Sequence, residues 1–157
     1  MNQNEKMSER DTDSTYVEIE GLCFDNRFTN ELNGDPDLSN TRRQLSHAYF
    51  SKVQPTETSK PETLAISIEA LKLLGLEASI TESDNFAQVF SGNALTRDME
   101  PHAMCYGGHQ FGNWAGQLGD GRAINLGEVI GKNDLRYMLQ LKGAGPTPYS
   151  RSGDGRA

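Results

Sequence analysis

The sequence predicts an α+β fold in which short helices precede an antiparallel pair of strands. Residues 16–103 contain helix-capping residues followed by apolar residues at helical spacing. Residues 104–157 begin with a run rich in glycine, which few regular helices tolerate. Two later runs, 122–130 and 135–142, have the apolar alternation of β-strands, and a turn joins them.

The chain of 157 residues is long enough for one domain with a hydrophobic core. We expect a disordered acidic tail at 1–15, an N-terminal extension with helices at 16–103, and the start of a further domain at 104–157. The sequence stops on the last residue of a repeated motif, with no strand, helix or cap after it. We therefore expect this to be the N-terminal part of a longer protein, with the further domain truncated.

The net charge of −7 limits the partners of the chain. Non-specific binding to nucleic acid or to an anionic membrane needs a basic face, so we expect neither partner. No run of 18 apolar residues is present, and the acidic, polar N-terminus excludes a secretory signal. Cys23 and Cys105 fit no disulfide framework or CxxC motif and indicate reduced thiols in the cytoplasm.

Two helices are expected in the extension. Ser59 and Glu62 have the spacing of a capping box, so the first helix should begin after Ser59 and end at Gly75. A second, short helix should begin at Thr81 and end before Gly92. Both helices carry apolar faces of the kind that pack in a core, so we expect a structural role for them.

The pentapeptide Gly-Asp-Gly-Arg-Ala occurs twice, at 119–123 and at 153–157, and Lys142 lies between the copies. Glycine lets backbone amides approach a bound anion. Arginine binds phosphate with a planar fork, and lysine binds it as a point charge. We expect a glycine loop over 106–121, followed by a strand, a turn and a second strand that ends in Lys142, the whole arranged to hold a nucleotide triphosphate.

Each residue also has a plain structural interpretation. The glycines could merely make tight turns, and Lys142 could be a solvated residue at a strand end. Together, however, they match the way protein kinases cover ATP with a glycine-rich turn and hold its phosphates with a lysine on the next strand. Ile124 stands where the third glycine of that pattern would be, and no Val-Ala-Ile-Lys occurs. The sequence contains neither a P-loop nor a dinucleotide-binding fingerprint.

Two long segments, 106–123 and 141–156, resemble the signature of the selenoprotein O family of kinase-like protein adenylyltransferases. Weaker matches lie at 24–28 and 90–93, and the resemblance covers about residues 22–157. It implies that residues 104–157 form the start of a kinase-like N-lobe. It also implies an enzyme that binds ATP in a flipped orientation and transfers AMP to Ser, Thr or Tyr hydroxyls of proteins, with release of pyrophosphate.

The resemblance also assigns residues. The positions that match the family's nucleotide contacts are Gly119, Gly121, Arg122, Lys142, Asp154 and Gly155. It implies Mg²⁺, for which Mn²⁺ could substitute, but it places the metal ligands and the catalytic aspartate beyond residue 157. We therefore assign no catalytic residue and no metal ligand within this chain.

Two alternatives stay open from the sequence. One is an ordinary protein kinase, which would transfer the γ-phosphoryl group. The other is an ATP-binding pseudokinase module without catalysis. All three hypotheses depend on Arg122 and Lys142 facing the same polyphosphate. In the two enzymes, these cations would stabilise the negative charge that develops during transfer.

Overall fold

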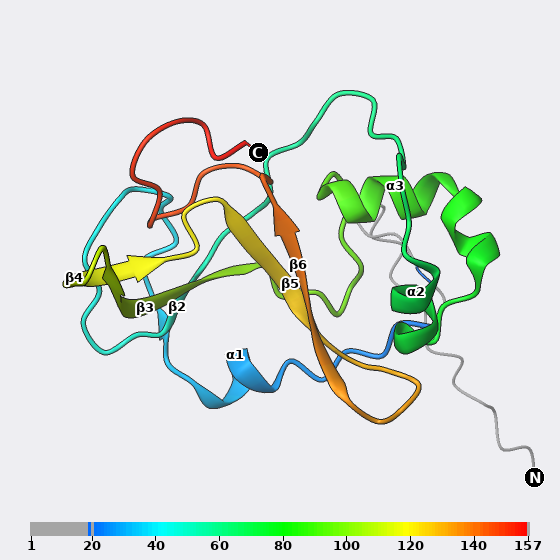
Figure 1. The fold of residues 1–157 in the computed structure, drawn as a ribbon, viewed down its shortest axis with the longest axis horizontal. Coiled ribbons are helices and arrows are strands. Elements are labelled where there is room, and N and C mark those ends of the chain that lie inside the picture. Colours follow the sequence, from blue (N-terminus) through cyan, green and yellow to red (C-terminus); the bar gives the residue numbers. More distant parts are fainter. Residues whose placement is uncertain (1–18, 20, 157) are drawn as a thin grey trace, which may run out of the picture.

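The computed structural model describes residue 19 and residues 21–156, and the predicted tail at 1–15 lies outside them. A twisted sheet runs through the middle of the molecule (Figure 1). Helices α2 (Ile68–Leu74) and α3 (Asp84–Ser91) lie on one side of it, and the hairpin of β3 (His102–Gln110) and β4 (Asn113–Gly119) extends to the other. The α+β fold class predicted from the sequence is confirmed.

The sheet has six strands in the order β1-β2-β3-β5-β6, with β4 paired to β3 off this path. The remaining four strands are β1 (Gly34–Asp35), β2 (Phe50–Lys52), β5 (Ala123–Ile130) and β6 (Arg136–Lys142). Only the β1–β2 pair is parallel among the described strands. The sheet thus contains strands from both 16–103 and 104–157, and the domain boundary near residue 104 stays a prediction.

The β5–β6 hairpin was predicted almost to the residue. Its register pairs Ala123 with Lys142 and Ile130 with Arg136. A β-bulge at Leu126 shifts the register. Because a bulge turns the following side chains, Ile124 and Leu126 pack into different hydrophobic clusters instead of sharing one face.

The glycine-rich segment is not the long loop that we expected. Its first part is the β3–β4 hairpin, which turns at Phe111 and Gly112, both with positive φ. A Cβ on Gly107 would lie 2.5 Å from the Trp114 ring, so this glycine makes room for a cross-strand aromatic residue. Only residues 120–122 form the loop between β4 and β5. The loop prediction was wrong for 106–119 because cross-strand packing outweighed the low strand propensity of glycine.

The first predicted helix begins later than expected. Helix α2 begins after Ser67, whose side chain accepts a hydrogen bond from the Ala70 amide (3.1 Å), and ends at Gly75 with φ 80°. The start predicted at Ser59 was wrong. Leu64, which would have faced the core, is 92% exposed, so a helix there would have had no packing to stabilise it.

Helix α3 is capped by Ser83 and ends at Gly92. The predicted cap Thr81 belongs instead to a 3₁₀ turn, η1 (Ala78–Glu82), which precedes the helix. A further short helix, α1 (Arg27–Glu31), lies at the lower edge of Figure 1. No described helix has the length and apolar character needed to cross a membrane. Cys23 is exposed and Cys105 is partly buried, and the two are not joined by a disulfide in the described part of the chain.

Two hydrophobic clusters hold the fold. The first joins the helices to one side of the β5–β6 hairpin and contains Leu71, Leu76, Phe86, Val89, Met99 and Leu126. The second lies under the β4–β5 loop and contains Val53, Ala103, Ile124, Ala144 and Tyr149. Leu141 packs against both clusters. The predicted structural role of the helices agrees with this packing, and the second cluster supports the site described next.

Candidate functional site

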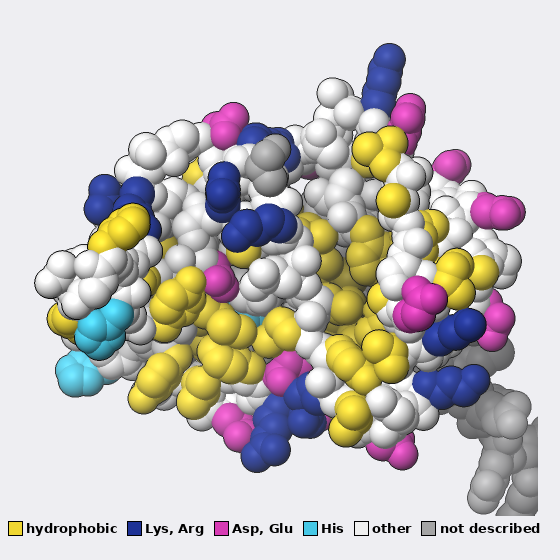
Figure 2. Space-filling model, in the orientation of Figure 1, with side chains coloured by type: hydrophobic (Ala, Val, Ile, Leu, Met, Phe, Trp, Pro, Cys, Tyr) yellow, Lys and Arg dark blue, Asp and Glu magenta, His cyan; other side chains and the backbone are white. Residues whose placement is uncertain are grey.

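A cleft of about 570 Å³ opens where the β4–β5 loop, the end of β6 and residues 149–152 meet. Four of the six predicted nucleotide-contacting residues line this cleft: Gly119, Gly121, Arg122 and Lys142. Figure 2 shows dark-blue side chains gathered over this part of the molecule, above the ends of β5 and β6. The cleft therefore brings together the two cations on which the sequence-based hypotheses depend.

The β5–β6 register explains why Arg122 and Lys142 come together. Lys142 pairs with Ala123, and the Gly143 amide donates to the Arg122 carbonyl (2.7 Å), so the two cationic residues leave neighbouring strands at the same end. Both side chains are exposed and have no hydrogen-bond or ion-pair partner among the described residues. Two unpaired cations in one cleft produce a local positive field that favours an anionic ligand.

The segment that follows β6 anchors the β4–β5 loop through hydrogen bonds. The Thr147 hydroxyl donates to the Asp120 carbonyl (2.6 Å), and the Ser150 hydroxyl donates to the Gly121 carbonyl. A Cβ on Gly119 would lie 2.5 Å from the Tyr149 ring. Close packing against Tyr149 thus requires glycine at position 119, in addition to the close approach of a ligand that we expect there.

The loop also presents backbone donors. The Asp120 amide bonds to the Met104 carbonyl (2.9 Å). The amides of Gly121 and Arg122 have no acceptor within the described part of the chain. Unpaired amides next to two cations are a typical anion-binding arrangement.

Asp120 has a structural role in the floor of the cleft. Its carboxylate accepts hydrogen bonds from the Met104 amide and from the Asn125 side chain, each at 3.0 Å. Asn125 is fully buried and in turn accepts a hydrogen bond from Gln140 (2.8 Å). The carboxylate therefore fixes the loop to β3 and β5, and it only partly offsets the positive charge of the cleft.

The described residues offer no ready metal site. Residues 19 and 21–156 contain no group of three or more His, Cys, Asp or Glu side chains that could hold a metal ion. Asp120, the acidic residue in the cleft, already accepts two hydrogen bonds. The Mg²⁺ implied by the family resemblance would need ligands from other residues.

The other two predicted nucleotide contacts do not line the cleft. The Asp154 carboxylate accepts a hydrogen bond from the Arg156 amide (3.0 Å) and closes a local turn. Gly155 is buried with φ 75°, and a Cβ there would lie 2.1 Å from the Gly145 carbonyl carbon. Their role as nucleotide contacts stays a prediction.

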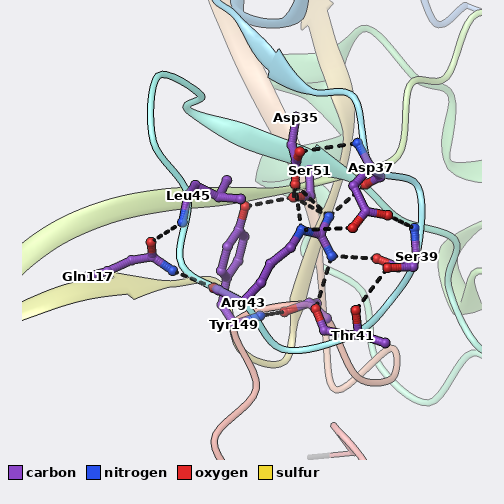
Figure 3. A network of polar contacts seen from close by, with 10 residues as sticks. Asp35, Asp37, Ser39, Thr41, Arg43, Leu45, Ser51, Gln117 and Tyr149 are labelled. Atoms are coloured by element: carbon purple, nitrogen blue, oxygen red, sulfur yellow. Dashed lines mark hydrogen bonds and ion pairs between the residues drawn. The ribbon is translucent and has the colours of Figure 1, made fainter.

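A polar network behind the loop was not predicted from the sequence (Figure 3). At its centre, the guanidinium of Arg43 donates from Nε to the Asp35 carboxylate (2.7 Å). Its terminal nitrogens donate to the carbonyls of Ser39 (2.7 Å), Thr41 (3.0 Å) and Asp37 (2.6 Å). One arginine thus organises residues 35–43 into a fixed loop.

This network reaches the β4–β5 loop through Tyr149. The Ser51 hydroxyl donates to Asp35 (3.1 Å) and bonds to the Tyr149 hydroxyl (2.9 Å). Burial raises the pKa of Tyr149 to about 12, so the phenol stays neutral. Burial alone would raise the pKa of Asp35, but hydrogen bonds from the Asp37 amide, Arg43 and Ser51 hold it below its ordinary value.

Sequence reasoning also missed Arg151, which lines the cleft and has no partner among the described residues. A signal was present, because Arg151 lies within the second signature segment and in a stretch with few acidic residues. Asp35 and Arg43 gave no such signal, since their pairing depends on the folded loop.

A largely antiparallel sheet with few helices, in which the lysine that ends β6 lies beside the glycine-containing loop between β4 and β5, is consistent with the N-terminal lobe of a protein-kinase-like fold. Comparison with protein families then gives the particular family. The model described as "Protein adenylyltransferase SelO" matches residues 35–157. The chain belongs to this family.

Curated relatives agree with this assignment. A protein of Azoarcus sp. (strain BH72) named "Protein nucleotidyltransferase YdiU" is 58% identical over 136 residues, which are 87% of this chain and 26% of that protein. A protein of the same name from Xanthomonas axonopodis pv. citri (strain 306) is 59% identical over the same shares. The chain therefore spans about a quarter of the length of these relatives.

Proposed function

We propose that this chain forms the nucleotide-binding part of a cytoplasmic protein adenylyltransferase, which transfers AMP from ATP to Ser, Thr or Tyr hydroxyls of proteins. The observation that carries this proposal is that Arg122 and Lys142 line one cleft beside the β4–β5 loop, and that neither side chain has a partner within residues 21–156. Membership of the SelO family and the relatives named nucleotidyltransferases support transfer of a nucleotidyl group. Two free cysteines are compatible with the cytoplasm.

The geometry suits the charge changes of this reaction. The hydroxyl oxygen of the acceptor would form a bond to the α-phosphorus and lose its proton to the catalytic aspartate, which we place beyond residue 157. The bond from that phosphorus to the bridging oxygen would break and release pyrophosphate. Negative charge grows on the α-phosphate oxygens and on the departing pyrophosphate. The amides of Gly121 and Arg122 are held in place by the anchored loop, and the side chains of Arg122 and Lys142 reach the same cleft, so together they would stabilise this charge.

Other parts of the machinery lie outside the cleft in our proposal. We place the catalytic aspartate and the ligands of Mg²⁺ in residues beyond 157, and the metal would supply further charge neutralisation when bound. Asp154 and Gly155 would make additional nucleotide contacts, which is supported by their place in the second copy of the repeated pentapeptide.

Labelled ATP tests the reaction directly. The full-length protein, incubated with Mg²⁺ and an acceptor protein, should incorporate label from α-³²P-ATP and none from γ-³²P-ATP. Label from γ-³²P-ATP alone would replace the proposal with a protein kinase. ATP binding without incorporation from either nucleotide would replace it with a binding module.

A variant pair tests the role of the cleft. Lys142→Ala should lower incorporation from α-³²P-ATP by at least about 100-fold, because it removes a donor to the reacting phosphates. Lys132→Ala is the matched control, since Lys132 is also exposed and lines a separate cavity beside the end of α2. Wild-type turnover in Lys142→Ala would remove this residue from the mechanism.

A further inference from the structure

A second cavity of about 390 Å³ opens beside the nucleotide cleft. The two share a wall made by Tyr106, Gly119, Tyr149 and Arg151, so a ligand in one would be a neighbour of a ligand in the other. The opposite wall of the second cavity comes from residues 42–44. This wall belongs to the loop that Arg43 organises, and it contributes nothing to the nucleotide cleft.

The loop presents Arg42 on a rigid support. Arg43 fixes the backbone on one side through its bonds to Ser39 and Thr41. On the other side, the Gln117 side chain of β4 donates to the Arg43 carbonyl (2.9 Å) and accepts from the Leu45 amide (2.7 Å), as Figure 3 shows. A cation on a fixed backbone loses less conformational freedom when it binds a ligand than one on a mobile loop does.

The charges of the second cavity are all of one sign. Arg42 and Arg151 are exposed and have no partner within residues 21–156, whereas the charge of Arg43 is met by Asp35. No Asp or Glu of the described residues lines this cavity. The exposed guanidinium of Arg42 can therefore donate two hydrogen bonds to one carboxylate, in the bidentate geometry that arginine prefers.

We propose that the second cavity binds an acidic side chain of the protein substrate close to the hydroxyl that is modified, with Arg42 as a specificity-determining residue. This inference rests on the proposed function, because it needs a protein acceptor next to the nucleotide. A peptide carboxylate fits the position better than the nucleotide does, since Arg122 and Lys142 already serve the polyphosphate from the other side of Tyr106 and Tyr149. The amides of Gln44 and Gln110, which also line the cavity, can bond to the backbone of such a peptide.

Paired acceptor peptides test this specificity in the full-length protein. One peptide carries Glu at the three positions on each side of a single Ser, Thr or Tyr, and the other carries Gln at the same positions. We expect kcat/KM from α-³²P-ATP to be roughly 10-fold higher for the Glu peptide, as expected for one charge-assisted pair. Arg42→Gln should remove this preference by raising KM for the Glu peptide alone, and leave both kcat and the KM for ATP unchanged.

Charge reversal and a control arginine sharpen the test. Arg42→Glu should invert the preference, so that a Lys-flanked peptide becomes the better acceptor. Arg27→Gln, a change at another exposed arginine, which lies on α1 and pairs with Glu31, should leave the preference intact. A rise in the KM for ATP in Arg42→Gln would assign the cavity to the nucleotide, and equal losses with both peptides would make Arg42 merely structural; either result overturns the inference.

A binding measurement separates this inference from the proposed function. Fluorescence anisotropy of the labelled Glu and Gln peptides, without ATP, should show tighter binding of the Glu peptide to wild-type protein and equal binding to Arg42→Gln. Equal binding to wild type overturns the inference even where AMP transfer is observed. Absence of AMP transfer with a preserved, Arg42-dependent binding difference would sink the proposed reaction and leave a site for acidic peptides.

Discussion

Arg43 and Arg122 show how differently one residue type is used in two neighbouring regions. Arg43 lies in the 35–45 loop with a side chain 16% exposed, in an ion pair with Asp35 (2.6 Å) and with hydrogen bonds to backbone carbonyls. Arg122 lies in the cleft, exposed and without a partner among the described residues. The donors of Arg43 are used by the fold, whereas those of Arg122 are left for a ligand.

The difference separates stability from function within this small structure. A charge that is largely buried must be paired, so removal of its partner leaves an uncompensated charge and destabilises the protein. An exposed, unpaired cation can be removed at little cost to folding. Changes in the two regions should therefore produce opposite patterns in unfolding and in nucleotide binding.

Arg43→Met should have the largest effect on stability. It removes the cation that pairs with the Asp35 carboxylate and the donors to several carbonyls, and we expect the free energy of unfolding to fall by about 3 kcal/mol. Urea unfolding of wild-type and variant proteins measures this. Arg43→Lys should recover only part of the loss, because lysine lacks the planar fork. A fall in the unfolding free energy of less than about 0.5 kcal/mol would show that the network does not stabilise the fold.

Gly119→Ala should have the next largest effect, because the new Cβ would lie 2.5 Å from the Tyr149 ring and 2.8 Å from the Met104 carbonyl oxygen. We expect a loss of about 2 kcal/mol from overpacking, with weaker ATP binding because the loop must move. Gly153→Ala is the control: it has φ 80° and open space around it, so only backbone strain of about 1 kcal/mol applies. A smaller loss for Gly119→Ala than for Gly153→Ala would contradict the packing argument.

Tyr149→Phe should cost about 1 kcal/mol at neutral pH, the value of a hydrogen bond to Ser51. The pKa of Tyr149 is raised from 10.0 to about 12, so the folded state disfavours ionisation. The stability tied to the neutral phenol is therefore complete below pH 10 and is lost as the pH rises toward 12. Urea midpoints from pH 9 to pH 12 should fall more steeply for wild type than for the variant, and parallel curves would refute this. The pH range of this test includes both the ordinary pKa of 10.0 and the raised pKa of about 12.

Arg122→Gln should have the smallest effect on stability. We expect a change in unfolding free energy below about 0.5 kcal/mol, because no described contact is lost. ATP affinity should nevertheless fall about 10-fold, a difference that calorimetric titration can measure. A stability loss as large as that of Arg43→Met would erase the contrast between the two regions.

The parts predicted correctly from the sequence are those set by local patterns. The β5–β6 hairpin follows from alternation around a turn, and the helix ends at Gly75 and Gly92 follow from glycine at a left-handed position. The meeting of Arg122 and Lys142 followed from that hairpin register. In each case a short stretch of sequence contains the whole cause.

The parts that were missed depend on contacts between distant residues. In the β3–β4 hairpin, Gly107 makes room for the Trp114 ring on the facing strand. The low strand propensity of glycine hides this contact from sequence analysis. The loop around Arg43 depends on Asp35, Ser51 and the distant Tyr149, and the sequence of that loop shows only turn residues. The start of α2 was misplaced because a capping pattern does not reveal whether a core exists to receive the helix.

The contact between Gly119 and Tyr149 also constrains how this protein can evolve. The ring and the Met104 carbonyl fill the space that any larger side chain at position 119 would require, so the glycine cannot be enlarged while the tyrosine is kept. A lineage that enlarged the glycine would need a smaller residue in place of the tyrosine and a shift of the backbone at Met104, and it would then lose the hydroxyl that bonds to Ser51. Homologues that keep the tyrosine should therefore keep the glycine as well, and those that lose the tyrosine no longer need the serine as its partner.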